Sequence, residues 1–231
     1  MVSIIVPTYN EYEGLPRLVS TIFGITDKAG INTEMIIIDD NSPDGTGDLA
    51  EELAKKYPIK VIHRSGKLGL SSAVMEGFHA GSGEIFIVTD ADLSHDVGII
   101  PKMVELIENG KAQLVIGSRY IKGGGIKNWP VFRYIVSRGA IFLSRGLTKI
   151  KDSMSGFFAL QRSVIESANL SPVGYKIGLE IFVKGKYERV IELPYVFVNR
   201  SEGRSKLSRG EFLNYLRHLK DLYSWKYFGK K

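Results

Sequence analysis

The sequence predicts an α/β protein with a mostly parallel central sheet flanked by helices. Short apolar runs rich in β-branched residues occur at 2–6, 35–38, 60–63 and 84–89, and such runs are typical of buried strands. Segments with helical spacing lie between them. Parallel strands need a crossover between them, so this alternation favours parallel pairing with helices on both faces of the sheet.

The first strand, at residues 2–6, is expected to end at Pro7, and the polar residues 8–11 follow it. From about Gly14 to Ile22, leucine, valine and isoleucine recur at the spacing of a helix with one apolar face. The chain therefore begins with a strand and a helix that packs on the sheet.

The second strand, at residues 35–38, ends in two carboxylates, Asp39 and Asp40, before a turn. A helix is expected to follow this turn. Thr46 and Asp48 are its candidate N-caps, because their side-chain oxygens can accept hydrogen bonds from the first backbone N–H groups of a helix.

A third strand at 60–63, a helix at 71–80 and a fourth strand at 84–89 continue the alternation. The fourth strand leads directly into Asp90 and Asp92. Two carboxylates at i and i+2 of a strand point the same way and repel each other. A divalent cation such as Mg²⁺ or Mn²⁺ removes that repulsion. The residues alone leave a second interpretation open, an aspartate-rich surface turn that caps the next segment.

Three polar clusters, at 9–11, 39–40 and 90–92, each follow a predicted strand. In open parallel sheets, ligands bind beyond the carboxyl ends of the strands. Because parallel strands end at the same edge, the three clusters should converge there. The sequence therefore predicts one binding site at this edge.

Charge is distributed unevenly along the chain, whose formal net charge is +6. Residues 1–110 contain 8 Lys and Arg against 17 Asp and Glu, whereas residues 111–231 contain 23 against 8. An acidic half suits a metal and nucleotide site, and a basic half suits an anionic partner. Nucleic acid is not the expected partner, since the basic residues match no nucleic-acid motif. The absence of cysteine excludes disulfides and thiol chemistry.

Seven segments, in order along the chain, resemble signature segments of the dolichol-phosphate mannosyltransferases. They are 7–11; 39–46; 90–95; 117–120; 123–124 with Trp129 and Arg133; 152–153 with 155–157; and Glu180 with 203–207. This family consists of inverting glycosyltransferases of the GT-A fold. The resemblance implies a single GT-A catalytic domain over 1–231, with a nucleotide-binding half at 1–117 and an acceptor-binding half at 118–231 that carries amphipathic helices.

The resemblance implies transfer of mannose from GDP-mannose to a dolichyl (polyprenyl) phosphate with inversion, which forms dolichyl β-D-mannosyl phosphate. One alternative is a related polyprenyl-phosphate glycosyltransferase with another donor, such as UDP-glucose. A second alternative is a non-catalytic module that binds nucleotide sugars. The presence of Asp90, Asp92, Arg119 and Arg133 favours an enzyme.

The resemblance also assigns the donor site. It implies that Asp92 ligates a divalent metal, Mg²⁺ or Mn²⁺, with support from Asp90, and that Asp40 reads the base. The remaining matches to substrate-binding positions are Pro7, Tyr9, Glu11, Ile38 and Ala91. Core packing is the alternative role for Tyr9 and Ile38. Asp39 is expected to be structural. Lys67 is either a nucleotide contact or a solvated charge.

For the acceptor phosphate, the resemblance implies Arg119, Arg133 and Ser137, the last two one helical turn apart. Arg204 and Lys206 belong to a segment expected to close over the diphosphate. The catalytic residues are thus expected to be Asp92, Arg119 and Arg133. A phosphate monoester is mostly dianionic at neutral pH, since its second pKa is about 6, so this transfer needs no general base. The roles of Asp96 and Glu180 stay open.

Two segments, 131–147 and 212–228, alternate apolar residues with Arg and Lys, as interfacial amphipathic helices do. Ordinary surface helices are the alternative for each. No stretch reaches the roughly 18–20 apolar residues that a spanning helix needs. We therefore expect the protein at the cytoplasmic face of a membrane, bound peripherally or through a transmembrane segment outside this sequence.

Overall fold

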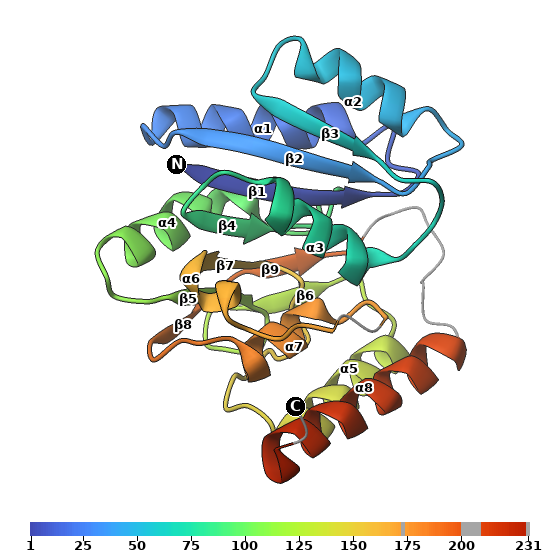
Figure 1. The fold of residues 1–231 in the computed structure, drawn as a ribbon, viewed down its shortest axis with the longest axis vertical. Helices are drawn as coiled ribbons and strands as arrows, with labels where there is room; N and C mark the ends of the chain where they lie inside the picture. Colours follow the sequence, from blue (N-terminus) through green and yellow to red (C-terminus); the bar gives the residue numbers. More distant parts are fainter. Residues whose placement is uncertain (172–173, 200–208, 230–231) are drawn as a thin grey trace.

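The computed structural model describes residues 1–171, 174–199 and 209–229. Its main feature is a seven-stranded sheet with the order β3-β2-β1-β4-β7-β5-β8 (Figure 1). The strands of this sheet are β1 (Val2–Thr8), β2 (Thr33–Asp39), β3 (Ile59–His63), β4 (Ile85–Val88), β5 (Leu114–Ser118), β7 (Phe158–Gln161) and β8 (Val190–Pro194). A second, two-stranded sheet pairs β6 (Gly125–Lys127) with β9 (Val196–Val198).

Helices cover both faces of the large sheet, as the alternation predicts. They are α1 (Leu15–Lys28), α2 (Thr46–Ala54), α3 (Leu70–Ala80), α4 (Ile100–Glu108) after the short 3₁₀ helix η1 (Val97–Ile99), α5 (Val131–Ser144), α6 (Ser163–Glu166), α7 (Ile177–Lys184) and α8 (Arg209–Phe228). Apolar residues of α1 and α4 form one core with the sheet, and those of α3 and α7 form another on the opposite face.

Strand direction decides where the site lies. Strands β1, β2, β3 and β4 pair in parallel, whereas β7 is antiparallel to both β4 and β5. Two reversals restore the direction, so β5 runs parallel to β4. The carboxyl ends of β1 to β5 therefore meet at one edge, which is on the right in Figure 1. The start of β7 lies at the same edge. The inserted antiparallel strand makes the sheet mostly, but not entirely, parallel.

Strand β1 continues through Pro7 to Thr8, so the expectation that it ends at Pro7 is wrong. Pro7 lies opposite Ile38 of β2, while the pairing of β1 with β4 stops at Ile5 and Val88. From this point β1 has a partner strand on one side only. A proline without an N–H group is tolerated there, as it is on an edge strand.

The start of α2 also differs from the expectation. The residue at the N-cap position is Gly45, with φ of 86°, and it makes no side-chain capping bond. Neither Thr46 nor Asp48 therefore caps this helix. Instead Asp44 Oδ1 accepts hydrogen bonds from the backbone N–H and the hydroxyl of Thr46, at 3.0 and 2.6 Å. The side chain that accepts these bonds in the first turn thus lies two residues before Thr46, the first of the two expected caps.

Helix α8 packs on α5 and α7 through a third apolar cluster that includes Tyr215, Leu219 and Leu222. The hydroxyl of Tyr215 donates to the carbonyl oxygen of Ala140 at 2.7 Å, and that of Tyr223 donates to Leu143 at 2.8 Å. One face of the C-terminal helix is thus part of the protein core. In the described part of the chain, no helix combines the length and the apolar character needed to cross a membrane.

Candidate functional site

The three polar clusters of the N-terminal half lie where the strand pattern predicts, at the carboxyl ends of β1, β2 and β4. A non-glycine residue with positive φ lies in or beside each cluster: Asn10, Asn41 and Leu93, with φ of 57°, 56° and 57°. Asparagine tolerates this conformation, but leucine adopts it rarely. Such strained residues gather at functional sites. The backbone therefore marks the same edge as the side chains do.

Asp40 is buried at the end of β2 and is held by two partners. Its Oδ1 accepts a short hydrogen bond from Arg64 Nη1, and its Oδ2 accepts one from the backbone N–H of Gly69 at 3.0 Å. The same guanidinium donates to Glu76 at 3.1 Å and to Ser72 at 2.6 Å. This network fixes the carboxylate, whose remaining lone pairs can accept hydrogen bonds from a ligand.

Arg64 was not among the predicted site residues. It follows β3, which pairs with β2 in parallel, and its backbone N–H donates to the carbonyl oxygen of Asp39. Polar residues that follow a parallel strand are expected at the carboxyl edge, and this rule applies to Arg64 after β3 as it does to the three predicted clusters. That signal was available in the sequence, but the pairing with Asp40 depends on the register of two strands.

Asp39 has the structural role that the sequence suggests. It is buried, and its carboxylate accepts hydrogen bonds from the Thr8 hydroxyl at 3.1 Å and from the backbone and hydroxyl of Ser42 at 2.9 and 2.5 Å. These bonds tie the ends of β1 and β2 together. Asp39 thereby holds the loop that carries Asp40.

The other predicted donor-site residues divide into two groups. Pro7, Tyr9 and Glu11 are half-buried at the end of β1. Lys67 Nζ lies 3.9 Å from the centre of the Tyr9 ring, a cation–π contact. The side chains of Ile38 and Ala91, by contrast, are buried in the two cores beside the sheet.

The assignment of Ile38 to the nucleoside pocket stays a prediction, and its side chain is completely buried. Its alternative role, core packing, is observed, because successive side chains of β2 alternate between the two buried faces of the sheet. Ala91 likewise offers a ligand its backbone only. Both residues lie next to aspartates of the candidate site.

Asp90 and Asp92 flank Ala91 in the loop after β4. The side chain of Asp90 is 40% exposed, and Asp92 Oδ1 accepts the backbone N–H of Ser94 at 3.0 Å. His95 Nδ1 accepts the backbone N–H of Asp90 at 3.2 Å, so the ring proton belongs on Nε2, 3.6 Å from Asp90 Oδ2. Burial lowers the pKa of His95, which keeps this ring neutral. The histidine thereby orients the loop that carries Asp90.

Carboxylate oxygens of this kind suit Mg²⁺ or Mn²⁺. No group of three or more His, Cys, Asp or Glu side chains within the described ranges is arranged to hold a metal. Two protein carboxylates nevertheless fit these ions, because Mg²⁺ is commonly held by one or two carboxylates together with substrate phosphates and water. Asp90 and Asp92 are the residues that would hold it.

Arg119 follows β5 and is fixed by Asp152, which is completely buried. Its Nε and Nη2 donate to the two oxygens of Asp152, both at 2.7 Å, and its backbone N–H donates to Asp152 at 2.9 Å. Burial disfavours the charge of Arg119, but Asp152 outweighs burial and raises the pKa. Among the described residues, no acceptor engages Nη1. Arg119 is therefore a charged group, held by Asp152 beyond the end of β5, whose Nη1 still has N–H donors to offer.

Arg133 lies in the first turn of α5. Its guanidinium carbon is 4.3 Å from the centre of the Trp129 ring, and Nη1 donates to Asn199 Oδ1 at 2.7 Å. Burial and the charge of Arg119 lower its pKa. Ser137, one turn along α5, accepts a hydrogen bond from the Tyr120 hydroxyl at 2.8 Å. The cation–π contact between Arg133 and Trp129 was not predicted from the sequence. Arg204 and Lys206 lie outside the described residues.

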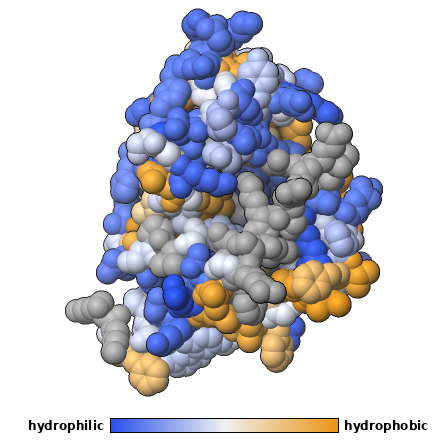
Figure 2. All heavy atoms as spheres, turned by 90° about the vertical axis from the view of Figure 1, so that its right-hand side faces the viewer, coloured by the Kyte–Doolittle hydropathy of each residue, from blue (hydrophilic) through white to orange (hydrophobic). Residues whose placement is uncertain are grey.

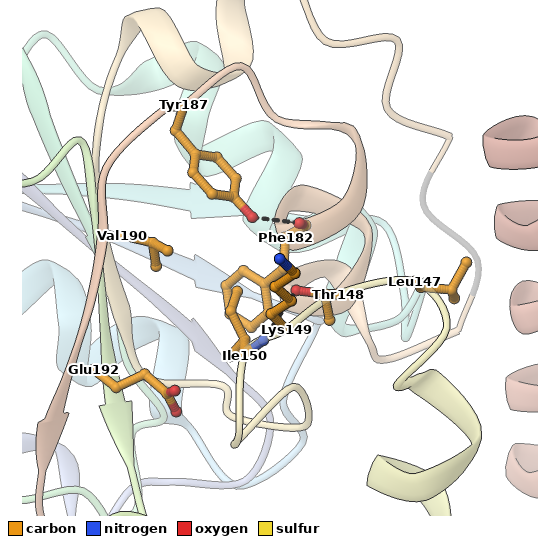
Figure 3. Close-up of a pocket in the computed structure, with 8 residues that line it drawn as sticks. All are labelled: Leu147, Thr148, Lys149, Ile150, Phe182, Tyr187, Val190 and Glu192. Carbon is orange, nitrogen blue, oxygen red and sulfur yellow. Dashed lines mark hydrogen bonds between the residues drawn. The ribbon is translucent and has the colours of Figure 1, made fainter.

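A separate cavity of about 350 Å³ lies between β8, α7 and the loop after α5 (Figure 3). None of the predicted site residues lines it. Its wall includes Glu192, whose carboxylate accepts the backbone N–H groups of Lys151 and Asp152, both at 3.0 Å. The cavity therefore lies next to the loop that carries Asp152 and is separate from the candidate site at the carboxyl edge.

Comparison with known proteins places the chain in a family. Residues 3–168 match the model of glycosyl transferase family 2. A dolichol-phosphate mannosyltransferase from Pyrococcus furiosus is 48% identical over 97% of this chain, which spans 64% of that relative. One of the same name from Saccharomyces cerevisiae is 38% identical, over 97% of this chain and 88% of that one. The chain belongs to glycosyl transferase family 2 and, within it, to the dolichol-phosphate mannosyltransferases.

Solved structures show the same GT-A fold. A mannosyltransferase from Pyrobaculum calidifontis in complex with GDP-Man and Mn²⁺ matches with a TM-score of 0.62 at 23% identity, over 96% of this chain and 63% of that one. Glucosyl-3-phosphoglycerate synthase from Mycobacterium tuberculosis with Mn²⁺, UDP and phosphoglyceric acid matches with a TM-score of 0.65 at 18% identity, over 97% and 77%. The expected fold class is confirmed.

Proposed function

We propose that this protein transfers mannose from GDP-mannose to a dolichyl or other polyprenyl phosphate with inversion, giving the β-linked lipid phosphate. The observation that carries the proposal is the division of the carboxyl edge. Carboxylates gather beyond β2 and β4, and guanidinium groups gather beyond β5 and at the start of α5. The names of the relatives support the substrates.

The donor belongs with the carboxylates. Asp40, fixed by Arg64 and Gly69, accepts N–H groups of the guanine edge. Asp90 and Asp92 would hold Mg²⁺ or Mn²⁺ together with phosphate oxygens of the donor. When bound, the metal neutralises the leaving diphosphate and acts as a Lewis acid. The Mn²⁺ in the complex of the Pyrobaculum calidifontis mannosyltransferase supports a divalent metal.

The acceptor phosphate belongs with Arg119, Arg133 and Ser137. Asp152 holds the guanidinium of Arg119 through Nε and Nη2, which leaves the N–H groups of Nη1 to donate to a phosphate. The acceptor is already a nucleophile, since a phosphate monoester is mostly dianionic at neutral pH. The protein has to hold it in line with the sugar and to compensate its charge. No residue is assigned as a general base.

A membrane surface is the place where a polyprenyl phosphate presents its headgroup. Helix α5 exposes Val131, Phe132, Ile135 and Phe142, and Val131 and Phe132 are 76% and 72% exposed. Figure 2 shows hydrophobic atoms gathered in the lower part of the carboxyl face, where Figure 1 has α5 and α8. Apolar residues beside Arg138 and Arg145 suit an interface of lipid and water. Peripheral binding at the cytoplasmic face is part of this proposal.

The membrane face is smaller than the sequence pattern indicates. Ile141 and Leu147 of the first segment are buried, and Leu219 of the second segment packs in the third cluster. Leu216 remains exposed, and Phe212 lies outside the described side chains. We therefore assign the membrane contact to the exposed residues of α5, with Leu213 and Leu216 of α8 beside them.

A panel of nucleotide sugars, each offered with one polyprenyl phosphate and Mn²⁺, tests the proposal. GDP-mannose should be the donor that yields a labelled lipid. Transfer from UDP-glucose in its place would move the protein to another group of polyprenyl-phosphate glycosyltransferases. Binding of a nucleotide sugar without transfer to any lipid phosphate would indicate a non-catalytic module.

A further inference from the structure

Lys176 lies directly before α7, where this helix meets the loop that starts at Asp152. The first turn of α7 packs so closely on this loop that a Cβ on Gly178 would lie 2.8 Å from the carbonyl oxygen of Ser155. Lys176 Nζ lies 3.4 Å from the carbonyl oxygen of Met154 in the same loop. The packing therefore places this ammonium group against the loop that begins at Asp152, the residue that holds Arg119.

The ammonium group of Lys176 is poorly satisfied. Within residues 1–171, 174–199 and 209–229, its contacts are the long bond to Met154 and the ring of Tyr175, whose centre is 4.6 Å away. No carboxylate in those ranges forms an ion pair with it. Burial lowers the pKa of Lys176 to about 8, and the charge of Arg119 acts in the same direction. Such a cation has hydrogen-bond donors to offer to an anionic ligand.

The charges around Lys176 are those of the candidate site. Arg119, Asp152, Asp90 and Arg133 act on it, in decreasing order. Asp152 neutralises Arg119, and Asp90 belongs with the metal. Within the described residues, no carboxylate forms an ion pair with Arg133 or Lys176. A phosphate monoester brings about 1.5 to 2 negative charges to these two cations.

We propose that Lys176 binds the phosphate of the lipid acceptor together with Arg119 and Arg133. This inference rests on the proposed function. In the transfer, a phosphate oxygen forms a bond to C1 of mannose while the bond from C1 to the diphosphate oxygen breaks. The acceptor changes from a dianionic monoester to a monoanionic diester, GDP leaves with the bonding electron pair, and no proton moves. Lys176 acts by holding the dianion in line.

The first test replaces Lys176 by Met, which removes the charge and keeps an unbranched stem. With a short-chain prenyl phosphate in detergent, Lys176→Met should raise the acceptor KM about ten- to hundredfold, as expected for one lost charge-assisted contact. The dissociation constant of GDP-mannose should change less than threefold. Lys186→Met, beyond the other end of α7 and exposed, is the matched control and should leave both constants unchanged.

The second test is the pH profile of Lys176→Arg. Wild-type kcat/KM for the acceptor should fall as pH rises through about 8, because the ammonium loses its proton there. Among the groups that face it, Arg119 and Arg133 stay charged, as guanidinium groups do. The other charged groups that face it are Asp152 and Asp90. Lys176→Arg should therefore retain its activity to higher pH. This readout does not depend on how well the Met variant folds.

Unchanged acceptor KM in Lys176→Met, or a pH profile that Lys176→Arg does not move, would overturn the inference. A rise in the GDP-mannose constant alone would assign Lys176 to the donor diphosphate and also overturn it. Failure of the proposed function looks different, since the wild-type protein would then transfer no mannose to prenyl phosphate.

Discussion

At the scale of single residues, the site consists of charged groups held by buried partners. Asp152 fixes Arg119 and Arg64 fixes Asp40, each through at least one short, buried bond. Breaking one partner of such a pair leaves an uncompensated buried charge, which typically costs about 3–5 kcal/mol. We therefore expect the loss of either partner to affect the stability of the protein as well as the candidate site.

Replacement of Arg64 by Met tests this support. We expect it to lower the free energy of unfolding by about 3 kcal/mol and to weaken GDP binding, because Asp40 loses its partner. Chemical denaturation and calorimetry measure the two effects. The control is Lys55→Met, which removes an exposed ion pair with Glu52 and should change stability by less than about 1 kcal/mol. Equal GDP affinity in Arg64→Met and the wild-type protein would contradict the role of Arg64.

Replacement of Asp92 by Asn tests the metal site. The amide oxygen of Asn can still accept the backbone N–H of Ser94, so the loop should keep its shape and the unfolding temperature should stay close to that of the wild-type protein. Turnover should fall by orders of magnitude, because the leaving diphosphate loses its counterion. Steady-state rates with Mn²⁺ and with a chelator check this. Normal rates in the variant, or full wild-type activity in chelator, would be incompatible with the assignment.

At the scale of helices and strands, the sequence predicts most of the first half and less of the second. Apolar runs and helical spacing give β1 to β4 and α1 to α3, because each is a local pattern. The antiparallel strand β7 is not visible in this way, since its place between β4 and β5 depends on contacts between residues far apart in the chain. The pairing of Arg64 with Asp40 is hidden for the same reason.

The two amphipathic helices show a related limit. An apolar stripe indicates burial but does not say against what. The structure divides the stripe, since Leu219 and Leu222 of α8 pack in the protein whereas Val131 and Phe132 of α5 face outward. Only the tertiary structure separates a face that packs on the protein from one that is exposed.

We expect Val131→Ser and Phe132→Ser each to weaken binding to phospholipid vesicles about tenfold, because each removes about 1–2 kcal/mol of apolar burial in the membrane. Vesicle sedimentation measures the binding. Val190→Ser on β8 removes an exposed valine away from α5 and should leave it unchanged. Equal losses in all three variants would show that α5 is not the membrane contact.

At the scale of the whole molecule, the two halves of the chain have opposite charge and meet at one edge of one sheet. The acidic half ends its strands in Asp40, Asp90 and Asp92, and the basic half contributes Arg119 and Arg133. Composition predicts this division, and the parallel direction of β4 and β5 brings the two sets of charges to the same edge. The central claim is that one set holds the donor and the other holds the acceptor.

The most direct test of this claim measures the dissociation constant of GDP-mannose and the KM of the acceptor in two variants. Asp40→Asn should raise the dissociation constant of GDP-mannose about tenfold and leave the acceptor KM within threefold, since an unpaired polar group costs about 1–3 kcal/mol. Arg133→Ala should do the reverse and raise the acceptor KM about ten- to hundredfold. Calorimetry gives the first constant and initial rates with a prenyl phosphate give the second. If Arg133→Ala abolished GDP-mannose binding and left acceptor saturation untouched, the division of the site would be contradicted.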